Sequence, residues 1–210
     1  MKYITYAMPE EAPRCALPPG CEAVVTGIGK VLAVSQLAKA LLREPAEMVI
    51  SVGFCGGLNG TPQGTMVMAD HTRQWDLFLN VPDIPLGHGY AMHCPLELPL
   101  VELATVPNPV RGMLISGDRF VDSTVHVNPG AVGVDMETAA LALLCCELNI
   151  PFVSIREVSD VADGPQGMPH QQFMDYIREK GPGYSEAILE VTALDPHRLS
   201  PPKKLVHCKA

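Results

Sequence analysis

The sequence has few basic residues relative to acidic ones, no paired cysteine motif and no long apolar run. Its 15 lysines and arginines stand against 23 aspartates and glutamates, which gives a formal net charge of −8 at pH 7. Such a chain repels a polyphosphate backbone unless its basic residues gather in one patch, and the pair Lys203-Lys204 is too short to form one. We therefore expect no nucleic-acid partner.

Signals for membrane insertion and export are also lacking. The longest apolar run lies around Leu141 to Cys146 and falls well short of the roughly 20 residues that cross a bilayer. The N-terminus runs straight into Glu10 and Glu11, which is unlike a secretory signal. We expect no membrane partner and a cytoplasmic location.

Cysteines and histidines give no framework for a disulfide or a metal. The seven cysteines are an odd number without a Cys-x-x-Cys pair, so neither a disulfide scaffold nor a zinc knuckle is predicted. Among the seven histidines, His88 and His93 lie five apart in an expected loop, and no His-Glu-x-x-His occurs. No metal and no cofactor are therefore expected.

The sequence does contain the pattern of an α/β domain. With 47% hydrophobic and 18% charged residues among 210, its composition is that of one globular domain. Short β-branched runs that end in Gly or Asp alternate with helical patterns, which favours a central sheet. The expected strands are Lys2 to Ala7, Cys21 to Thr26, Met48 to Val52, Thr65 to Ala69, Gly112 to Ser116, Val132 to Asp135 and Phe152 to Val158.

Three helical segments are expected, two between these strands and one after the last of them. A second helix begins near Glu137 with Asp135 placed as its cap, and a last one covers Met168 to Leu194 with an interruption at Gly181-Pro182-Gly183. The first helix spans Lys30 to Arg43 and is expected to bury the apolar residues that recur at steps of three and four, namely Val31, Val34, Ala38, Leu41 and Leu42.

Glycine and proline mark the boundaries of the domain. They crowd the stretch from Val81 to Pro109, which predicts a loop. The residues from Pro196 onward have the composition of a loosely held tail. We therefore predict one domain at 1–195 and a C-terminal tail at 196–210.

Two glycine motifs follow expected strands. Gly27-Ile28-Gly29-Lys30 opens a helix, which suits either phosphate binding or a tight turn, and it matches neither the dinucleotide nor the P-loop pattern. Gly53 to Leu58 ends a buried strand with glycines, Gly56 among them, that allow a ligand to approach the backbone. Within it, Cys55 is interpreted as a small buried residue rather than as a nucleophile.

Carboxylates follow the ends of three expected strands. Glu10 and Glu11 follow the first, Asp135 and Glu137 the sixth, and Asp160 the last. Ligands bind at the carboxyl ends of strands in open α/β sheets. Each residue alone is more readily a helix cap or a solvated charge than a catalytic group, but their shared position favours a common pocket.

Taken together and in their order along the chain, these motifs resemble the purine nucleoside phosphorylase and nucleosidase superfamily, and most closely its 5′-methylthioadenosine/S-adenosylhomocysteine nucleosidase branch. The resemblance implies a three-layer α/β fold with a central mixed, twisted and partly barrel-like sheet, a small-molecule purine nucleoside as ligand, and a homodimer. The segments that carry it are Ala7 to Glu11, Gly27 to Val31, Gly53 to Leu58, Ser116 to Phe120, Val134 to Glu137 and Ser159 to Asp163.

The resemblance also implies roles for single residues. Glu11 would activate a water molecule as general base, and Asp160, held by Ser159, would protonate the purine as general acid. Met136 and Glu137 would hold the ribose. The other expected substrate-binding residues are Phe120, which would stack on the purine, Val121, whose backbone would read the base edge, and Gly56.

Several alternatives stay open at this point. The residues that bind phosphate in the phosphorylase branch are absent here, because Ser51 and Phe54 occupy the corresponding positions. Hydrolysis is therefore favoured over phosphorolysis. The segment from Arg73 to Val110 is shorter than in nucleosidases, which leaves the 5′ group undetermined and futalosine- or adenosylhopane-type substrates possible. Trp75, Phe78 and Leu79 would line the 5′ pocket or an apolar interface. A non-catalytic nucleoside-binding protein is the remaining alternative.

Overall fold

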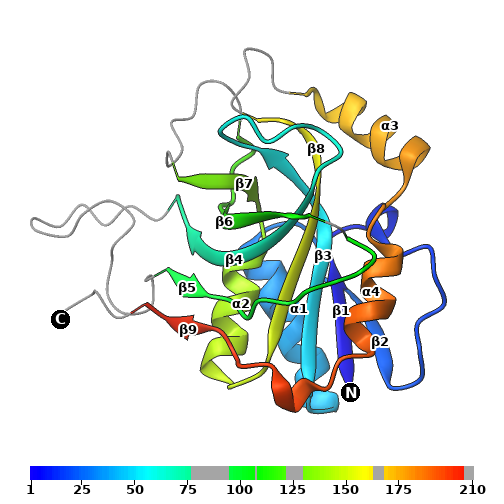
Figure 1. Ribbon diagram of the computed structural model, residues 1–210, viewed down its shortest axis with the longest axis vertical. Coiled ribbons are helices and arrows are strands. Elements are labelled where there is room, and N and C mark those ends of the chain that lie inside the picture. The colour runs from blue at the N-terminus through cyan, green and yellow to red at the C-terminus, as the bar shows by residue number, and fades with distance from the viewer. Residues whose placement is uncertain (77–94, 107, 122–129, 163–167, 206–210) are drawn as a thin grey trace, which may run out of the picture.

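A mixed β-sheet forms the centre of the molecule, seen in a computed structural model that describes residues 1–76, 95–106, 108–121, 130–162 and 168–205 (Figure 1). The strands are β1 (Lys2–Tyr6), β2 (Cys21–Val25), β3 (Met48–Gly57), β4 (Met66–Gln74), β5 (Leu96–Glu97), β6 (Val110–Ser116), β7 (Ala131–Asp135), β8 (Phe152–Val161) and β9 (Lys203–Lys204). The helices are α1 (Lys30–Arg43), α2 (Thr138–Glu147), α3 (His170–Lys180) and α4 (Ser185–Thr192), with short 3₁₀ turns η1 (Pro9–Glu11) and η3 (Pro196–Arg198).

The sheet partly closes on itself. Strand β1 pairs in parallel with β2 on one side and β3 on the other. Strand β3 continues past this layer and pairs with β8 and β7, and the pairings of β8 with β4, β4 with β6 and β6 with β7 complete a closed circuit. The predicted mixed, partly barrel-like sheet is therefore confirmed.

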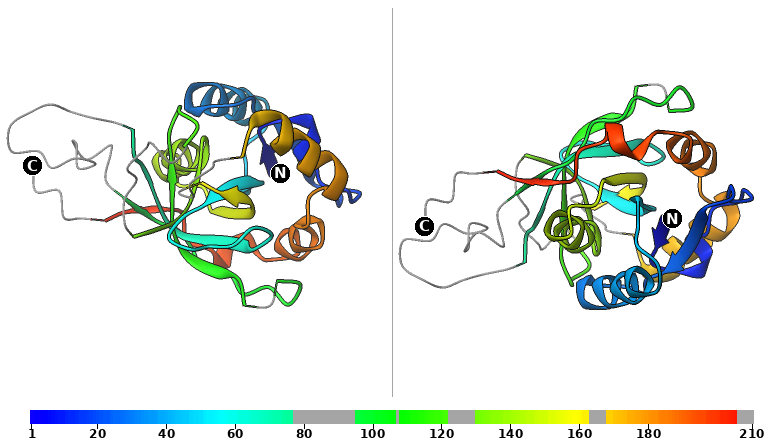
Figure 2. Two further views of the ribbon diagram at one scale, coloured as in Figure 1. Left: turned by 90° about the horizontal axis from the view of Figure 1, so that it is seen from above. Right: turned by 90° about the horizontal axis from the view of Figure 1, so that it is seen from below.

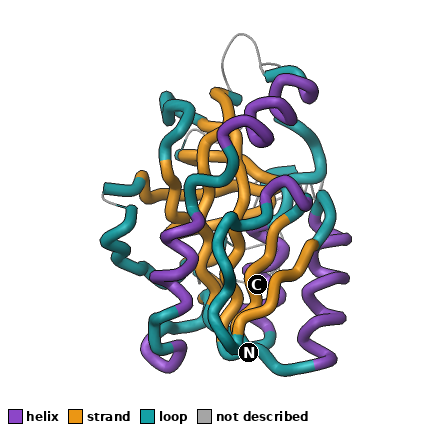
Figure 3. Tube along the Cα trace, turned by 90° about the vertical axis from the view of Figure 1, so that its right-hand side faces the viewer, coloured by secondary structure: helices purple, strands orange, loops and turns teal. Residues whose placement is uncertain are grey.

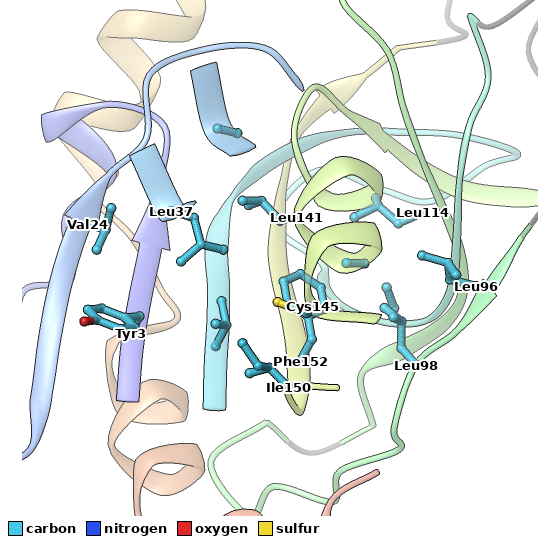
Figure 4. Close-up of a cluster of buried hydrophobic side chains, with 14 of the residues drawn as sticks. Tyr3, Val24, Leu37, Leu96, Leu98, Leu114, Leu141, Cys145, Ile150 and Phe152 are labelled. Carbon is cyan, nitrogen blue, oxygen red and sulfur yellow. The ribbon is translucent and has the colours of Figure 1, made fainter. Parts of the chain in front are cut away.

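Successive side chains of β1 and β3 point to opposite faces of the sheet. Both faces carry apolar residues, and helices cover both. Tyr3 and Val49 pack on one side with Leu37 of α1, in a buried cluster that also takes in α2 (Figure 4). Ile4 and Ile50, one residue further along each strand, pack on the other side with α4. Figure 2 shows α1 and α4 on opposite sides of these strands. The hydrophobic effect of these two clusters holds the layers together.

The expected buried face of α1 is wrong in part, although Leu41 packs against the buried cluster. Leu42 is 87% exposed and Val31 is 75% exposed, whereas Ala33, Leu37 and Ala40 form the buried stripe. The helix carries more than one apolar stripe, so spacing alone could not choose between them. The observed stripe faces α2 and β2, where two alanines let the backbones approach closely.

The other predicted elements are confirmed, with shifted ends. The long strands β3 and β8 continue to Gly57 and Val161, beyond the expected ends, and carry site residues on these extensions. The last helical segment is broken as expected, into α3 and α4. Most of the expected loop at 81–109 falls outside the described residues, and β5 lies within the remainder. In the expected tail at 196–210, β9 pairs with β5, so this part is held to the sheet.

Candidate active site

A cavity of about 130 Å³ opens where strands β1, β7 and β8 end and β3 passes by. Figure 3 shows α3 at the end of the sheet opposite the N-terminus. The lining residues come from segments far apart in sequence: Ala7, Met8, Glu11, Ile28, Phe54, Cys55, Gly56, Arg119, Phe120, Val121, Val134, Asp135, Met136, Glu137, Ser159, Asp160, Ala162 and Phe173. The predicted convergence of carboxylates at the strand ends is thus present.

Glu11 is buried and held by backbone amides on both carboxylate oxygens. Its Oε2 accepts hydrogen bonds from the N–H groups of Ala7 at 2.9 Å and Met8 at 3.0 Å, and Oε1 accepts one from Phe54 at 3.2 Å. Gly53 makes room for this contact, since a Cβ there would lie 2.9 Å from Oε1. The Tyr184 hydroxyl donates to the Glu11 carbonyl oxygen at 2.8 Å and fixes the backbone as well.

Two effects oppose each other at Glu11. Burial raises its pKa above the ordinary value, while the backbone amide of Phe54 and the charge of Arg156 lower it. The hydrogen bonds from backbone amides stabilise the ionised form. Oε1 accepts one of the three, which leaves it a lone pair that can accept a proton.

Asp160 has a different environment at the end of β8. Its Oδ1 lies 2.6 Å from the Ser159 hydroxyl, which is also 3.2 Å from the Cys55 carbonyl oxygen. Oδ2 is buried. Burial raises the pKa of Asp160, and hydrogen bonds from the Ser159 hydroxyl and the Met168 backbone amide oppose part of this shift. Asp160 lines the cavity, so its carboxyl group borders the space for a ligand.

Glu137 lines the same cavity as these two acids and is held by the N-cap residue of α1. The Gly29 N–H donates to its Oε1 at 2.8 Å. The Lys30 N–H donates to Asp118 Oδ1 at 2.8 Å. Two amides of the Gly27-Ile28-Gly29-Lys30 turn thus donate to the chain's own carboxylates, and the Gly27 N–H donates to the Ala7 carbonyl oxygen, which favours the tight-turn interpretation of this motif over phosphate binding.

Glu137 should make stability depend on pH. Burial and the neighbouring Asp135 raise its pKa from 4.5 to about 8. The folded state then binds more protons than the unfolded state between these pH values, so the free energy of unfolding falls as pH rises from about 4.5 to about 8. We expect Glu137→Gln to flatten this decline in calorimetric melting temperatures. The exposed Glu186→Gln is the control, and equal pH dependence in all three proteins would contradict the prediction.

The opposite wall of the cavity is the segment after β6. Phe120 is 49% exposed at the cavity, and Val121 is buried beside it. The Asp118 N–H donates to Asp76 Oδ2 at 2.7 Å, and Lys30 Nζ lies 2.5 Å from Asp76 Oδ1. These contacts fix the start of the segment against α1 and the residues after β4.

A buried ion pair lies beneath the cavity. Arg156 Nε donates to Asp135 Oδ2 at 3.0 Å, and its NH2 group donates to Ser51 Oγ at 2.9 Å and Thr138 Oγ1 at 2.7 Å. Asp135 also accepts from the Thr138 N–H at the start of α2, so its carboxylate holds the helix N-terminus as expected, although Glu137 occupies the N-cap position. Arg156 therefore has its donors occupied by the protein.

Removal of Arg156 should destabilise the fold. In Arg156→Met the Asp135 carboxylate would remain buried without its counter-charge, which costs about 3–5 kcal/mol. Urea unfolding measures the change, and Arg178→Met is the control because Arg178 is exposed and lies 3.7 Å from Glu10. A loss below about 1 kcal/mol would mean that the buried pair contributes no more than a surface pair.

All the site residues expected from sequence line the cavity: Glu11, Asp160, Phe120, Val121, Met136, Glu137, Ser159 and Gly56. Gly56 is also required by packing, since a Cβ there would lie 2.6 Å from that of Ala162. Cys55 is buried, which raises the pKa of its thiol and disfavours a thiolate. Trp75 is not among the lining residues, and Phe78, Leu79, His88 and His93 lie outside the described residues.

Sequence reasoning missed the supports of the site. Nothing in the motifs indicated that Gly29 would hold Glu137, that Tyr184 would hold Glu11, or that Phe173 of α3 would reach the cavity. Among the described residues, no group of three His, Cys, Asp or Glu side chains could hold a metal ion. No helix in the described ranges is long and apolar enough to cross a membrane.

A partly closed mixed sheet with a carboxylate-lined cavity at its strand ends defines a nucleoside phosphorylase-like α/β protein. A family model described as the phosphorylase superfamily matches residues 21–190. The chain belongs to this superfamily, which confirms the resemblance inferred from the motifs.

Solved structures with the same fold include nucleosidases of two bacteria. Streptococcus pneumoniae methylthioadenosine/S-adenosylhomocysteine nucleosidase in complex with 8-aminoadenine matches with a TM-score of 0.74 and 24% identity over 92% of this chain and 99% of that one. A futalosine hydrolase mutant of Helicobacter pylori matches with a TM-score of 0.76 and 21% identity over 92% and 99%. A Helicobacter pylori methylthioadenosine nucleosidase mutant with 5′-methylthioadenosine in its active site matches with a TM-score of 0.73 and 21% identity. The match covers 92% of this chain and 98% of that one.

Proposed function

We propose that the protein hydrolyses the N-glycosidic bond of a 5′-modified purine nucleoside, such as methylthioadenosine or S-adenosylhomocysteine, and releases the purine base. One observation carries the proposal: two buried carboxyl groups line one cavity and are hydrogen-bonded differently. Burial raises the pKa of both groups; three backbone amides and the charge of Arg156 oppose the shift at Glu11, whereas the Ser159 hydroxyl and one backbone amide oppose it at Asp160. A general base and a general acid need this division.

The division matches the demands of the reaction. An N-glycosidic bond breaks through an oxocarbenium-like state, and the purine leaves poorly unless it is protonated. Asp160 would donate a proton to a purine ring nitrogen, while Glu11 would take one from the attacking water. Ser159 would orient the Asp160 carboxyl group through their contact at 2.6 Å.

The remaining lining residues would hold the substrate between these two acids. Phe120 would stack on the purine and the Val121 backbone would read its edge. Met136 and Glu137 would hold the ribose, with Glu137 accepting hydrogen bonds from its hydroxyl groups. Gly56 would let the substrate approach the strand backbone.

Charge favours water over phosphate as the nucleophile. Glu11 is the carboxylate at the proposed nucleophile position, and Arg119 is the one described lining residue with a permanent positive charge. The nearby Arg156 is held by Asp135, Ser51, Thr138 and the Ile155 carbonyl oxygen. A phosphate dianion beside Glu11 would therefore meet repulsion that Arg156 is not free to offset, which supports hydrolysis over phosphorolysis.

A futalosine-type nucleoside is the second candidate substrate. The observation that favours it is the TM-score of 0.76 with the futalosine hydrolase mutant of Helicobacter pylori. The acid and base assigned above would serve this substrate equally, since the two candidates differ in the 5′ substituent and the base rather than in the bond that breaks.

The test is release of free adenine or hypoxanthine from a panel of nucleosides, with and without phosphate. The panel comprises methylthioadenosine, S-adenosylhomocysteine, 5′-deoxyadenosine, adenosine, inosine and futalosine. We expect release without phosphate. Release that requires phosphate would instead make the protein a phosphorylase, and nucleoside binding without any release would make it a non-catalytic binding protein.

We further propose that residues 1–195 form the catalytic domain and that the protein works as a cytoplasmic homodimer. Both expectations come from the resemblance and the composition. Sedimentation at several protein concentrations tests the oligomeric state, and truncation after residue 195 tests the domain boundary.

A further inference from the structure

One wall of the cavity is apolar and aromatic. Phe54, Phe173 and Met8 line it, and Phe54 is buried. The Phe54 ring meets the Phe173 ring edge-on, with centroids 6.3 Å apart and an interplanar angle of 89°. Tyr176 and Tyr184 complete the contacts of Phe54, at centroid distances of 6.1 and 6.0 Å. Edge-to-face pairs of this kind stabilise one ring arrangement beyond their buried area.

A buried carboxylate fastens α3 in this position. Glu157 is opposite Phe54 in the pairing of β8 with β3 and is 2% exposed. Its Oε1 lies 2.5 Å from Lys180 Nζ at the end of α3, and its Oε2 accepts a hydrogen bond from the Gly183 N–H at 2.8 Å. These contacts tie both ends of the α3–α4 turn to the strand that carries Asp160. The aromatic wall is therefore built into the fold without a ligand.

The charged groups around the wall are already paired within the described residues. Lys180 is held by Glu157, Arg178 lies 3.7 Å from Glu10, and Glu11 accepts three backbone hydrogen bonds. Arg119, the one described cation of the cavity lining, adjoins Phe120, which the proposed function assigns to the purine. An amino-acid group placed against Phe54 and Phe173 would therefore bring an ammonium and a carboxylate to an apolar surface. Burial of unpaired charges is costly, whereas an alkyl group would gain from contact with the rings.

The position of the wall indicates which part of the substrate meets it. In the proposed function the base lies between Phe120 and Asp160, and Glu137 holds the ribose. Met8, Phe54 and Phe173 then remain for the substituent on the 5′ carbon.

We propose that Phe54 is a specificity-determining residue that makes the cavity select an uncharged, apolar group on the 5′ carbon and reject an amino-acid group. This rests on the proposed nucleosidase function and narrows its substrate class. Of the two nucleosides in the first part of that proposal, methylthioadenosine fits the wall and S-adenosylhomocysteine does not.

A matched pair of substrates tests the selection directly. S-Adenosylhomocysteine and 5′-butylthioadenosine have the same chain length on sulfur and differ in the ammonium and carboxylate groups. We expect kcat/KM for the butylthio compound to exceed that for S-adenosylhomocysteine by about 100-fold or more in the wild-type protein, since loss of partners for buried polar groups gives large discrimination. Equal values would overturn the proposal.

Variants assign the selection to Phe54. Phe54→Ser should lower the ratio of the two kcat/KM values at least tenfold, whereas Phe54→Leu, which keeps an apolar side chain, should largely preserve it. Leu100→Ser, at an exposed position, is the control. It also replaces an apolar side chain by serine and should leave the ratio unchanged. Melting temperatures establish that each variant is folded. An unchanged ratio in folded Phe54→Ser would show that Phe54 does not determine the specificity.

Failure of the proposed function is distinguishable from failure of this inference. If no nucleoside of the panel is cleaved, calorimetric affinities of 5′-butylthioadenosine and S-adenosylhomocysteine replace the kinetic ratio. A higher affinity for the butylthio compound would then support the selection in a binding protein. Equal affinities would overturn it, whatever the outcome for catalysis.

Discussion

Asp160→Asn should lower kcat for release of adenine by about 10²- to 10⁴-fold, the usual contribution of a positioned general acid. The amide keeps the shape of the side chain and can still accept from the Ser159 hydroxyl, which lies 2.6 Å from Oδ1. It cannot deliver an acidic proton to the purine. Initial rates on methylthioadenosine measure the effect, and melting temperatures check the fold.

Two comparisons separate loss of the acid from general damage. Asp175→Asn makes the same change at an exposed position on α3 and should leave kcat within about twofold of wild type. A 4-nitrophenyl riboside, whose leaving group departs without protonation, should lose little rate in Asp160→Asn. Near-normal rates on methylthioadenosine in the variant would remove Asp160 from the mechanism.

The pH profile should change in the same variant. Burial raises the pKa of Asp160, so the acid stays protonated to higher pH than an exposed aspartate would. In the wild-type protein kcat should fall as pH rises through this pKa. In Asp160→Asn the remaining activity should lack this descending limb, because the group whose deprotonation causes it is gone.

The sheet could be predicted from sequence because β-branched runs are local signals. Strands such as Lys2–Tyr6 and Cys21–Val25 are bounded by turn residues that the sequence displays. The buried face of α1 could not be predicted, because both of its apolar stripes satisfy a helical period and α2 decides between them. The closure of β8 onto β4 depends on pairing across distant segments, which leaves no local pattern.

The lining of the site was predictable to the extent that its motifs are local. Glu11, Asp135, Glu137 and Asp160 directly follow strands, so their meeting at one edge follows from topology. The groups that hold them are different. The Gly29 amide reaches Glu137 across 108 positions, and Tyr184 reaches Glu11 across 173. The aromatic wall requires α3 to fold back over β3, which depends on the buried Glu157.

Glu11→Gln should abolish most turnover for a reason that its hydrogen bonds make specific. An amide is a poor base, so kcat should fall by about 10²- to 10⁴-fold. The amide nitrogen would also face a backbone N–H in either orientation, since Ala7 and Met8 donate to one oxygen and Phe54 to the other. An unsatisfied buried donor costs about 1–3 kcal/mol, so urea unfolding should show a loss of this size.

The neighbouring Glu10→Gln gives a matched control, because Glu10 lies in the same turn and its side chain is partly exposed beside Arg178. It should change neither kcat nor the free energy of unfolding appreciably. The 4-nitrophenyl riboside separates the two acids, since it relieves the need for Asp160 but not for an activated water. Glu11→Gln should therefore stay slow on the substrate that largely rescues Asp160→Asn. If the riboside rescued both variants alike, Glu11 would have no role in activating the nucleophile.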